Sequence, residues 1–216
     1  MVYTPHPQAL PFVARWVEVD GFQEADRVKK LCTPLTEAEV RLLRASDEVV
    51  INGTVYTARD MAHRRLCQSI DRGESLPIDL KGAILYFVGP TPARPGRVIG
   101  AAGPTTSARM DPFSPKLIAH GLRAMIGKGY RNEEVRQALV QYGAVHLSTL
   151  GGAGALLSRH IVRAEVIAYE DLGTEAIRRL EVVDFPAIVA YDATGGSVYD
   201  DLRGKTRISE STTFVE

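Results

Sequence analysis

The chain has 216 residues, with 26 Lys and Arg against 26 Asp and Glu, and 45% of its residues are hydrophobic, which suits one large globular domain or two small ones. The balanced charge argues against a protein that binds nucleic acid by neutralising phosphates, and no apolar run approaches the about 20 residues that span a membrane. Because the first residues lack the basic and apolar regions of a secretory signal, we expect a cytoplasmic protein.

Three regions differ in their patterning. Residues 1–30 contain three prolines and scattered charges without a hydrophobic period, and we interpret them as an arm that faces a partner. Regular patterns run from residue 31 to residue 200 and indicate one domain. Residues 201–216 are polar and are expected to form a tail.

The first regular elements carry clear signals. Thr36 and Glu39 form a capping-box pattern that predicts a helix start. Residues 48–58 are rich in β-branched side chains and contain Asn52-Gly53, a pair typical of tight hairpin turns. This segment therefore predicts two short strands joined by a hairpin.

The segment from Arg59 to Gly73 has a helical pattern, and its candidates for burial are Met61, Leu66 and Ile70. Strands and helices alternate in the remainder of the domain. We expect strands at 83–89, 97–103, 123–127, 144–149 and 163–170, helices at 114–122, 132–142, 151–161 and near 174–180, and strands with a Gly-Gly hairpin within 181–200. This order predicts an α/β domain with a mixed sheet and flanking helices.

Familiar cofactor motifs are absent or weak. Residues 121–128 resemble a P-loop but have one residue too many between the glycines, and Gly129 stands where a magnesium-binding hydroxyl is needed. The glycines of residues 151–154 favour close helix–sheet packing over a dinucleotide site. Cys32 and Cys67 are too few for a four-thiolate zinc or iron–sulfur centre within the chain, so we interpret them as ordinary buried thiols and expect no metal ligands here.

A more specific pattern occupies residues 103–115, with the sequence GPTTSARMDPFSP. It predicts a turn into a short helix that ends at Pro112, with Arg109 on the same side as Thr105. Backbone N–H groups at a helix start and a guanidinium together suit a carboxylate. A capped turn with a solvated arginine explains the same residues equally well.

Three further residues have a functional and a structural interpretation. Arg59 starts a helix after a strand and could clamp an anion, although its spacing alone favours a surface position. His63 lies one turn later and is more typical of a hydrogen-bonded structural histidine. Lys128 lies between two glycines after a strand, where ligand sites of α/β proteins occur, or it is a solvated loop lysine. Together, Arg59, Arg109 and Lys128 could hold a small dianion, with a threonine hydroxyl beside them to handle a proton.

Several stretches are similar to one known family. They are INGTVYTARDMAHRRL (51–66), VGPTPARPGRVIGAAGPTTSARMDPFSP (88–115), MIGKG (125–129), HLSTLGGAGALL (146–157) and AYEDLGTEAIRRLEVVDFPAIVAYDATG (168–195). On these motifs the chain resembles the β subunit, or C-terminal domain, of class I iron–sulfur fumarate hydratases and tartrate dehydratases.

The resemblance implies roles for four residues. Thr105 corresponds to the threonine proposed as the base that removes a proton from a malate carbon, and Arg59, Arg109 and Lys128 correspond to cationic substrate contacts. It also implies a swivelling β/β/α domain. The [4Fe–4S] cluster would belong to a partner α subunit, in an α2β2 assembly.

The sequence leaves more than one substrate possible. The motifs favour fumarate over L-tartrate or mesaconate. Two other hypotheses are a non-catalytic anion-binding module and a self-sufficient isomerase or lyase that uses His63.

Overall fold

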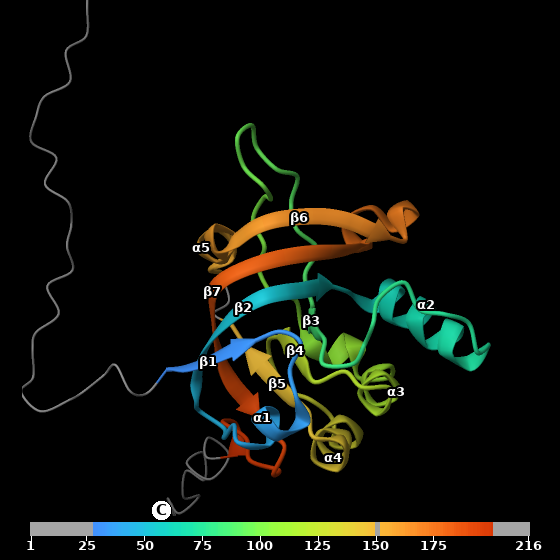
Figure 1. Cartoon of the computed structure of the whole chain (residues 1–216), viewed down its shortest axis with the longest axis vertical. Coiled ribbons are helices and arrows are strands. Elements are labelled where there is room, and N and C mark those ends of the chain that lie inside the picture. Colours follow the sequence, from blue (N-terminus) through green and yellow to red (C-terminus); the bar gives the residue numbers. More distant parts are fainter. Residues whose placement is uncertain (1–27, 150–151, 201–216) are drawn as a thin grey trace, which may run out of the picture.

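The computed structural model describes residues 28–149 and 152–200. Seven strands form one mixed sheet in the order β1-β2-β3-β4-β5-β7-β6 (Figure 1). They are β1 (Lys29–Cys32), β2 (Glu48–Thr57), β3 (Ile84–Tyr86), β4 (Ala124–Gly127), β5 (Val145–Ser148), β6 (Ile161–Ala168) and β7 (Ile177–Tyr191). Because β2 also pairs with β7, the five strands β2, β3, β4, β5 and β7 close into a barrel.

The direction of the strands creates one functional rim. Strands β2, β3, β4 and β5 pair with one another in parallel, whereas β7 runs antiparallel to β5 and β2. The carboxyl ends of the four parallel strands therefore meet at one end of the barrel, which is where ligand sites of parallel sheets lie.

Helices cover one side of the barrel and form parts of the segments that connect its strands (Figure 1). Helices α2, α3 and α4 lie together on that side. The α-helices are α1 (Glu37–Arg41), α2 (Asp60–Asp71), α3 (Ser114–Ala119), α4 (Glu133–Tyr142) and α5 (Gly154–Leu157), and the 3-10 helices are η2 (Ser107–Met110), η3 (Ser158–His160) and η4 (Glu170–Glu175). Within the described residues, no helix is long and apolar enough to cross a membrane.

The core has two parts because side chains of a strand alternate between its faces. Ile84 and Tyr86 of β3 pack in the cluster that includes β2, β5 and β7 side chains, which fills the barrel. Leu85 and Phe87 pack instead with the apolar faces of α2, α3 and α4. This burial of both faces explains the continuous apolar run at residues 83–89 and confirms its assignment as a buried strand.

The predicted hairpin at residues 48–58 is wrong. The segment is one continuous strand, β2, and Asn52-Gly53 marks a shift of register against β7. Gly53 has φ +104°, and a Cβ there would lie 2.5 Å from Thr33 Oγ1. The glycine therefore permits an irregularity inside a strand that pairs on both edges. Sheet pairing thus outweighs the local preference of Asn52-Gly53 for a turn.

Two other segments differ from expectation. Residues 97–103 form no strand, and residues 91–98 are exposed in a projecting loop, green in Figure 1. The expected helix near 174–180 is replaced by η4, and β7 begins at Ile177 because Ile177 and Leu180 are buried. Pairing with both β2 and β6 thus overrides helix propensity there.

The capping box of Thr36 and Glu39 is confirmed. Met61 is 40% exposed, not buried as predicted, and Cys32 is exposed whereas Cys67 is buried. The predicted tail lies outside the described residues, as does the predicted arm except for residues 28–30.

Candidate active site

Four residues predicted from the sequence lie at the carboxyl rim of the barrel. Arg59 follows the last residue of β2 by two positions, and Lys128 directly follows β4. Thr105 lies at the end of β3, because its backbone N–H donates to the carbonyl of Phe87 at 2.8 Å. Arg109 is on η2, which begins two residues after Thr105. Three chain segments far apart in sequence thus meet at one rim.

Thr105 and Lys128 lie on neighbouring segments that are bonded to each other. The Thr105 hydroxyl donates to the Phe87 carbonyl at 2.9 Å. The next residue, Thr106, bridges Lys128 in parallel, and Ser107 N–H donates to the Lys128 carbonyl at 2.9 Å. Lys128 itself is exposed. The Thr105 hydroxyl and the Lys128 ammonium therefore belong to two neighbouring backbone segments that are hydrogen-bonded to each other.

Arg109 is held beside the start of α2 by an ion pair with Asp60. Its side chain is still 50% exposed, so it is accessible to a ligand. Asp111, the other acid near this segment, is bound instead to Arg131. Asp60 is thus the carboxylate that balances Arg109.

Arg59 lies deeper in the rim, with its side chain 18% exposed. Its Nη2 atom is 3.3 Å from Glu175 Oε1 on η4, and the other Glu175 oxygen accepts from Met61 N–H at the start of α2. Gly89 leaves room for the guanidinium, since a Cβ there would be 2.8 Å from Arg59 Nη1. Glu175 was not found from the sequence, because no motif marks it and it lies far from Arg59 along the chain.

The buried Arg59 Nε atom has no hydrogen-bond partner within the described residues. Two nearby side-chain atoms, Asp60 Oδ1 and His63 Nε2, are also buried without a hydrogen bond within the described residues, although Asp60 Oδ1 lies 3.9 Å from Arg59 Nε as an ion pair. Buried polar atoms without hydrogen bonds are costly. Their grouping at the start of α2 therefore makes this region a candidate ligand site.

His63 has the structural position expected of it. Its Nδ1–H donates to the Arg59 carbonyl at 2.9 Å, and its ring meets Phe87 edge-on with centroids 5.1 Å apart. Burial lowers the pKa of His63 to about 4, so the imidazole is neutral near pH 7. It fixes the first turn of α2, which begins with Arg59 as its N-cap.

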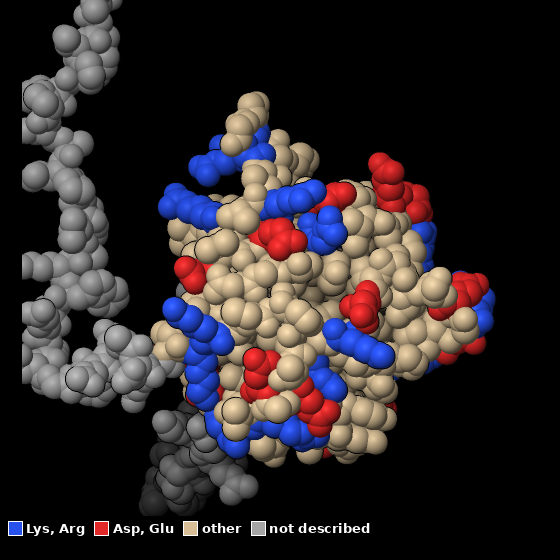
Figure 2. Space-filling view, in the orientation of Figure 1, with Lys and Arg blue, Asp and Glu red and all other residues tan. Residues whose placement is uncertain are grey.

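The charge of the rim suits a small anion. Among the described residues, Arg59 pairs with Asp60 and Glu175, Arg109 pairs with Asp60, and Lys128 has no carboxylate within ion-pair distance. On the face shown in Figure 2, by contrast, Lys and Arg alternate with Asp and Glu. The three cations against the two carboxylates, Asp60 and Glu175, give the rim a local excess of positive charge.

The part of the chain that the structure describes offers no site that could hold an iron–sulfur cluster. Within the described ranges, no group of three or more His, Cys, Asp or Glu side chains is arranged to hold a metal ion. Its two cysteines are free, one exposed near the N-terminal edge of the sheet and one buried on α2. An iron–sulfur cluster does not fit the donor set of this part of the chain.

The chain is similar in sequence to several known proteins. It matches the family described as Fumarase C-terminus over residues 4–202. It is 36% identical over 187 residues to the aerobic class I fumarate hydratase of Salmonella typhimurium, covering 85% of this chain and 32% of that protein. It is 36% identical over 154 residues to fumarate hydratase 1, mitochondrial, of Leishmania major, covering 70% of this chain and 28% of that protein.

A shorter relative matches this chain over most of its own length. The putative L(+)-tartrate dehydratase subunit beta of Methanocaldococcus jannaschii is 37% identical over 177 residues, which cover 79% of this chain and 91% of that protein. The chain therefore spans about a third of the fumarate hydratase of Salmonella typhimurium and most of a protein named as a subunit.

Proposed function

Because the chain belongs to the fumarase C-terminus family, we propose that it is the β subunit of a [4Fe–4S] hydro-lyase that interconverts fumarate and L-malate. The observation that carries this proposal is the meeting of Thr105 with Arg59, Arg109 and Lys128 at one rim of the barrel. A proton-handling hydroxyl beside three cations suits a dicarboxylate that gains or loses water.

The three cations have distinct parts in this proposal. Arg109 and the exposed Lys128 bind carboxylate oxygens of the substrate, and the deeper Arg59 fixes the orientation of the bound molecule. When a proton leaves the carbon next to a carboxylate, negative charge accumulates on that carboxylate. Fixed cations stabilise this charge most where water is excluded.

Thr105 carries the proton in our proposal. In dehydration it removes a proton from a malate carbon while the hydroxyl group leaves from the neighbouring carbon, and in hydration it returns that proton. A threonine hydroxyl is a weak base at its ordinary pKa. The neighbouring cations favour its alkoxide form, which is the form that accepts the proton.

We place the [4Fe–4S] cluster on a partner α subunit, since residues 28–149 and 152–200 of this chain contain no ligand set to hold it. There the cluster would supply the Lewis acid that binds the departing hydroxyl group. The active assembly is proposed to be α2β2 and cytoplasmic, with this chain as a swivelling β/β/α domain. A partner chain is supported by the Methanocaldococcus jannaschii relative, which is named as a subunit and matches over 91% of its own length.

A second substrate is favoured by a specific observation. The Methanocaldococcus jannaschii relative named for L(+)-tartrate dehydratase matches over 91% of its own length. L-tartrate, or mesaconate, presents two carboxylates as fumarate does, so the same three cations would bind it. Comparison of kcat/KM for fumarate, L-tartrate and mesaconate by the reconstituted complex decides among them.

The test is anaerobic reconstitution with the cluster-bearing chain encoded in the same organism. We expect the isolated chain to be inactive and the complex to hydrate fumarate. Thr105→Val should lower kcat on the order of a thousandfold or more. Thr54→Val, which removes a half-buried hydroxyl on β2, is the matched control and should leave kcat unchanged.

Three results would contradict parts of the proposal. Full activity of Thr105→Val in the complex would remove the role of that hydroxyl. Binding of dicarboxylates by the chain without turnover in any complex would favour a non-catalytic anion-binding module. Activity of the isolated, metal-free chain would instead support a self-sufficient enzyme.

A further inference from the structure

A buried ion pair joins two of the segments that form the rim. Arg131 Nε donates to Asp111 Oδ1 at 2.6 Å, and the two side chains are 0% and 8% exposed. Asp111 follows η2, whereas Arg131 lies three residues after Lys128. The second Asp111 oxygen accepts from Asn132 N–H at 2.8 Å, so the carboxylate binds that loop twice.

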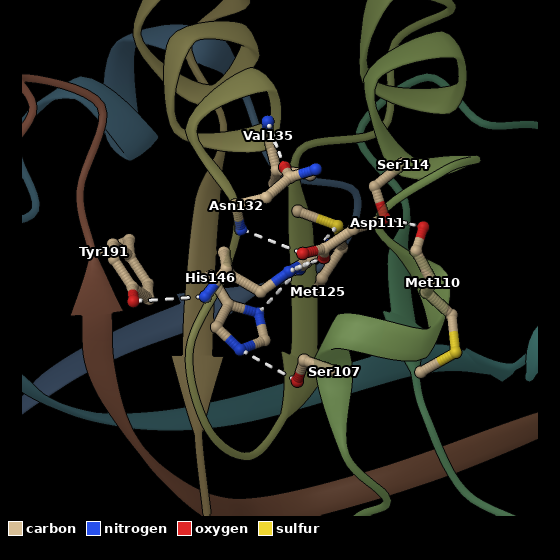
Figure 3. A network of polar contacts seen from close by, with 10 residues as sticks. Ser107, Met110, Asp111, Ser114, Met125, Asn132, Val135, His146 and Tyr191 are labelled. Atoms are coloured by element: carbon tan, nitrogen blue, oxygen red, sulfur yellow. Dashed lines mark hydrogen bonds and ion pairs between the residues drawn. The ribbon is translucent and has the colours of Figure 1, made fainter.

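The same arginine extends the contact to the other end of η2 (Figure 3). Its Nη1 atom lies 3.3 Å from His146 Nδ1 on β5, and His146 Nε2 lies 3.1 Å from Ser107 Oγ. A guanidinium can only donate, so Nδ1 accepts and the hydrogen of the neutral ring is on Nε2. His146 therefore donates to Ser107, and burial next to Arg131 keeps the pKa of His146 well below its usual range.

The network holds η2 at both ends. Ser107 is its first residue, and Asp111 directly follows its last. Arg131 also donates to Ser114 Oγ at 2.7 Å, and Ser114 Oγ donates to the Met110 carbonyl at 2.8 Å. Between these fixed points lies Arg109.

Burying this many polar groups is not an efficient way to gain stability. An ion pair removed from water loses much of its attraction to desolvation, and apolar residues often stabilise a core as well. What the network supplies is a fixed geometry, since the guanidinium only donates, the carboxylate only accepts, and each nitrogen of the neutral imidazole has one role. The segments that it fixes carry Thr105, Arg109 and Lys128.

We propose that His146, Arg131 and Asp111 are positioning residues for the dicarboxylate reaction, which lock the Thr105–Asp111 segment onto the Gly127–Asn132 segment. None of the three is placed in contact with substrate; they act through the residues that are. This inference rests on the proposed function and adds to it a set of residues whose loss changes catalysis more than folding.

The experiment uses the full chain reconstituted with its cluster-bearing partner. His146→Leu removes both hydrogen bonds of the ring at similar volume, and His146→Gln restores a donor toward Ser107. Leu43→Ala is the control for lost stability: Leu43 is 2% exposed and precedes β2, at the opposite end of that strand from Arg59. The melting temperature of each complex is measured together with kcat and KM for fumarate.

We expect His146→Leu to lower kcat/KM on the order of tenfold to a hundredfold, as small misplacement of reacting groups does. His146→Gln should recover a part of this loss. Leu43→Ala should keep kcat within about twofold at a comparable decrease in melting temperature. Equal activity loss in Leu43→Ala, or unchanged kcat/KM in His146→Leu, would overturn the inference.

Amide hydrogen exchange separates this inference from the proposed function. In His146→Leu, the amides of Ser107 and Asn132 should exchange faster than in Leu43→Ala, because the two segments come apart. If the wild-type complex has no hydro-lyase activity, the proposed function fails, and the role of the network in catalysis fails with it. If activity is present but exchange in the two variants is the same, only the positioning inference fails.

Discussion

Arg109 and Asp60 form an ion pair that joins η2 to the first residue of α2. The two residues are far apart in sequence, and each neighbours another candidate site residue: Asp60 follows Arg59, and Arg109 lies four positions after Thr105. The pair thus sets how the two arginines of the rim are placed, and it also lowers the net positive charge available to a substrate.

Asp60→Asn tests the balance of charge in the rim. The amide can still accept from Arg109, but the site gains one net positive charge, so the KM for a dianionic substrate should fall about twofold to fivefold at low ionic strength. Asp71→Asn is the matched control, because Asp71 pairs with Lys116 at the far end of the same helix. An equal decrease in KM for both variants would contradict a local effect.

Gly89→Ala tests the position of Arg59. The new Cβ would lie 2.8 Å from Arg59 Nη1, so the guanidinium must move, and because this is the end of a flexible side chain the protein should stay folded. We expect KM to increase about tenfold, a loss typical of one displaced charged contact. Measured in an Arg59→Ala background, the same substitution should add no further increase; an additive increase would show that Gly89 acts by another route.

Gly127→Ala tests the packing beneath the rim. A Cβ at Gly127 would lie 2.1 Å from Ser107 Oγ and 2.9 Å from a ring carbon of Phe87. We expect the free energy of unfolding to decrease by about 3 kcal/mol, as in other overpacked cores. Gly103→Ala is the control, since its nearest contact would be an ordinary 3.6 Å, and its unfolding in urea should remain within about 1 kcal/mol of wild type. Similar losses in both variants would rule out the clash as the cause.

His63 should make the protein sensitive to acid. Its pKa is lowered by burial from 6.5 to about 4, so between these values the unfolded chain binds a proton that the folded chain does not. Stability from this group is complete above pH 6.5 and falls as the pH decreases toward 4, by up to about 3 kcal/mol. The slope of unfolding free energy against pH over this interval should be smaller in His63→Leu, apart from the similar contribution of His146. Identical slopes would show that His63 is not buried in its neutral form.

Several elements followed from local patterns in the sequence. The capping box at Thr36, the buried run at residues 83–89 and the helix before Gly143 each depend on neighbours a few positions away, so their signals are complete within a short window. The motif around Thr105 and Arg109 was visible for the same reason.

Closure of the barrel could not be predicted in this way. The pairing of β2 with β7 connects residues more than a hundred positions apart, and it turned Asn52-Gly53 from an expected hairpin into an irregularity within a strand. Pairing with β6 and β2 also made residues 177–180 the start of strand β7, where local propensity favoured a helix.

The sequence by itself determined which residue types could handle a dicarboxylate, because charge and hydroxyl chemistry are properties of single side chains. Its two cysteines also excluded a centre held by four thiolates of this chain. Only the tertiary structure decided which groups restrain those side chains. Glu175 beside Arg59, Asp60 beside Arg109 and the buried His146–Arg131–Asp111 network arise from contacts between distant segments, and such contacts form only when the parallel strands bring their carboxyl ends to one rim.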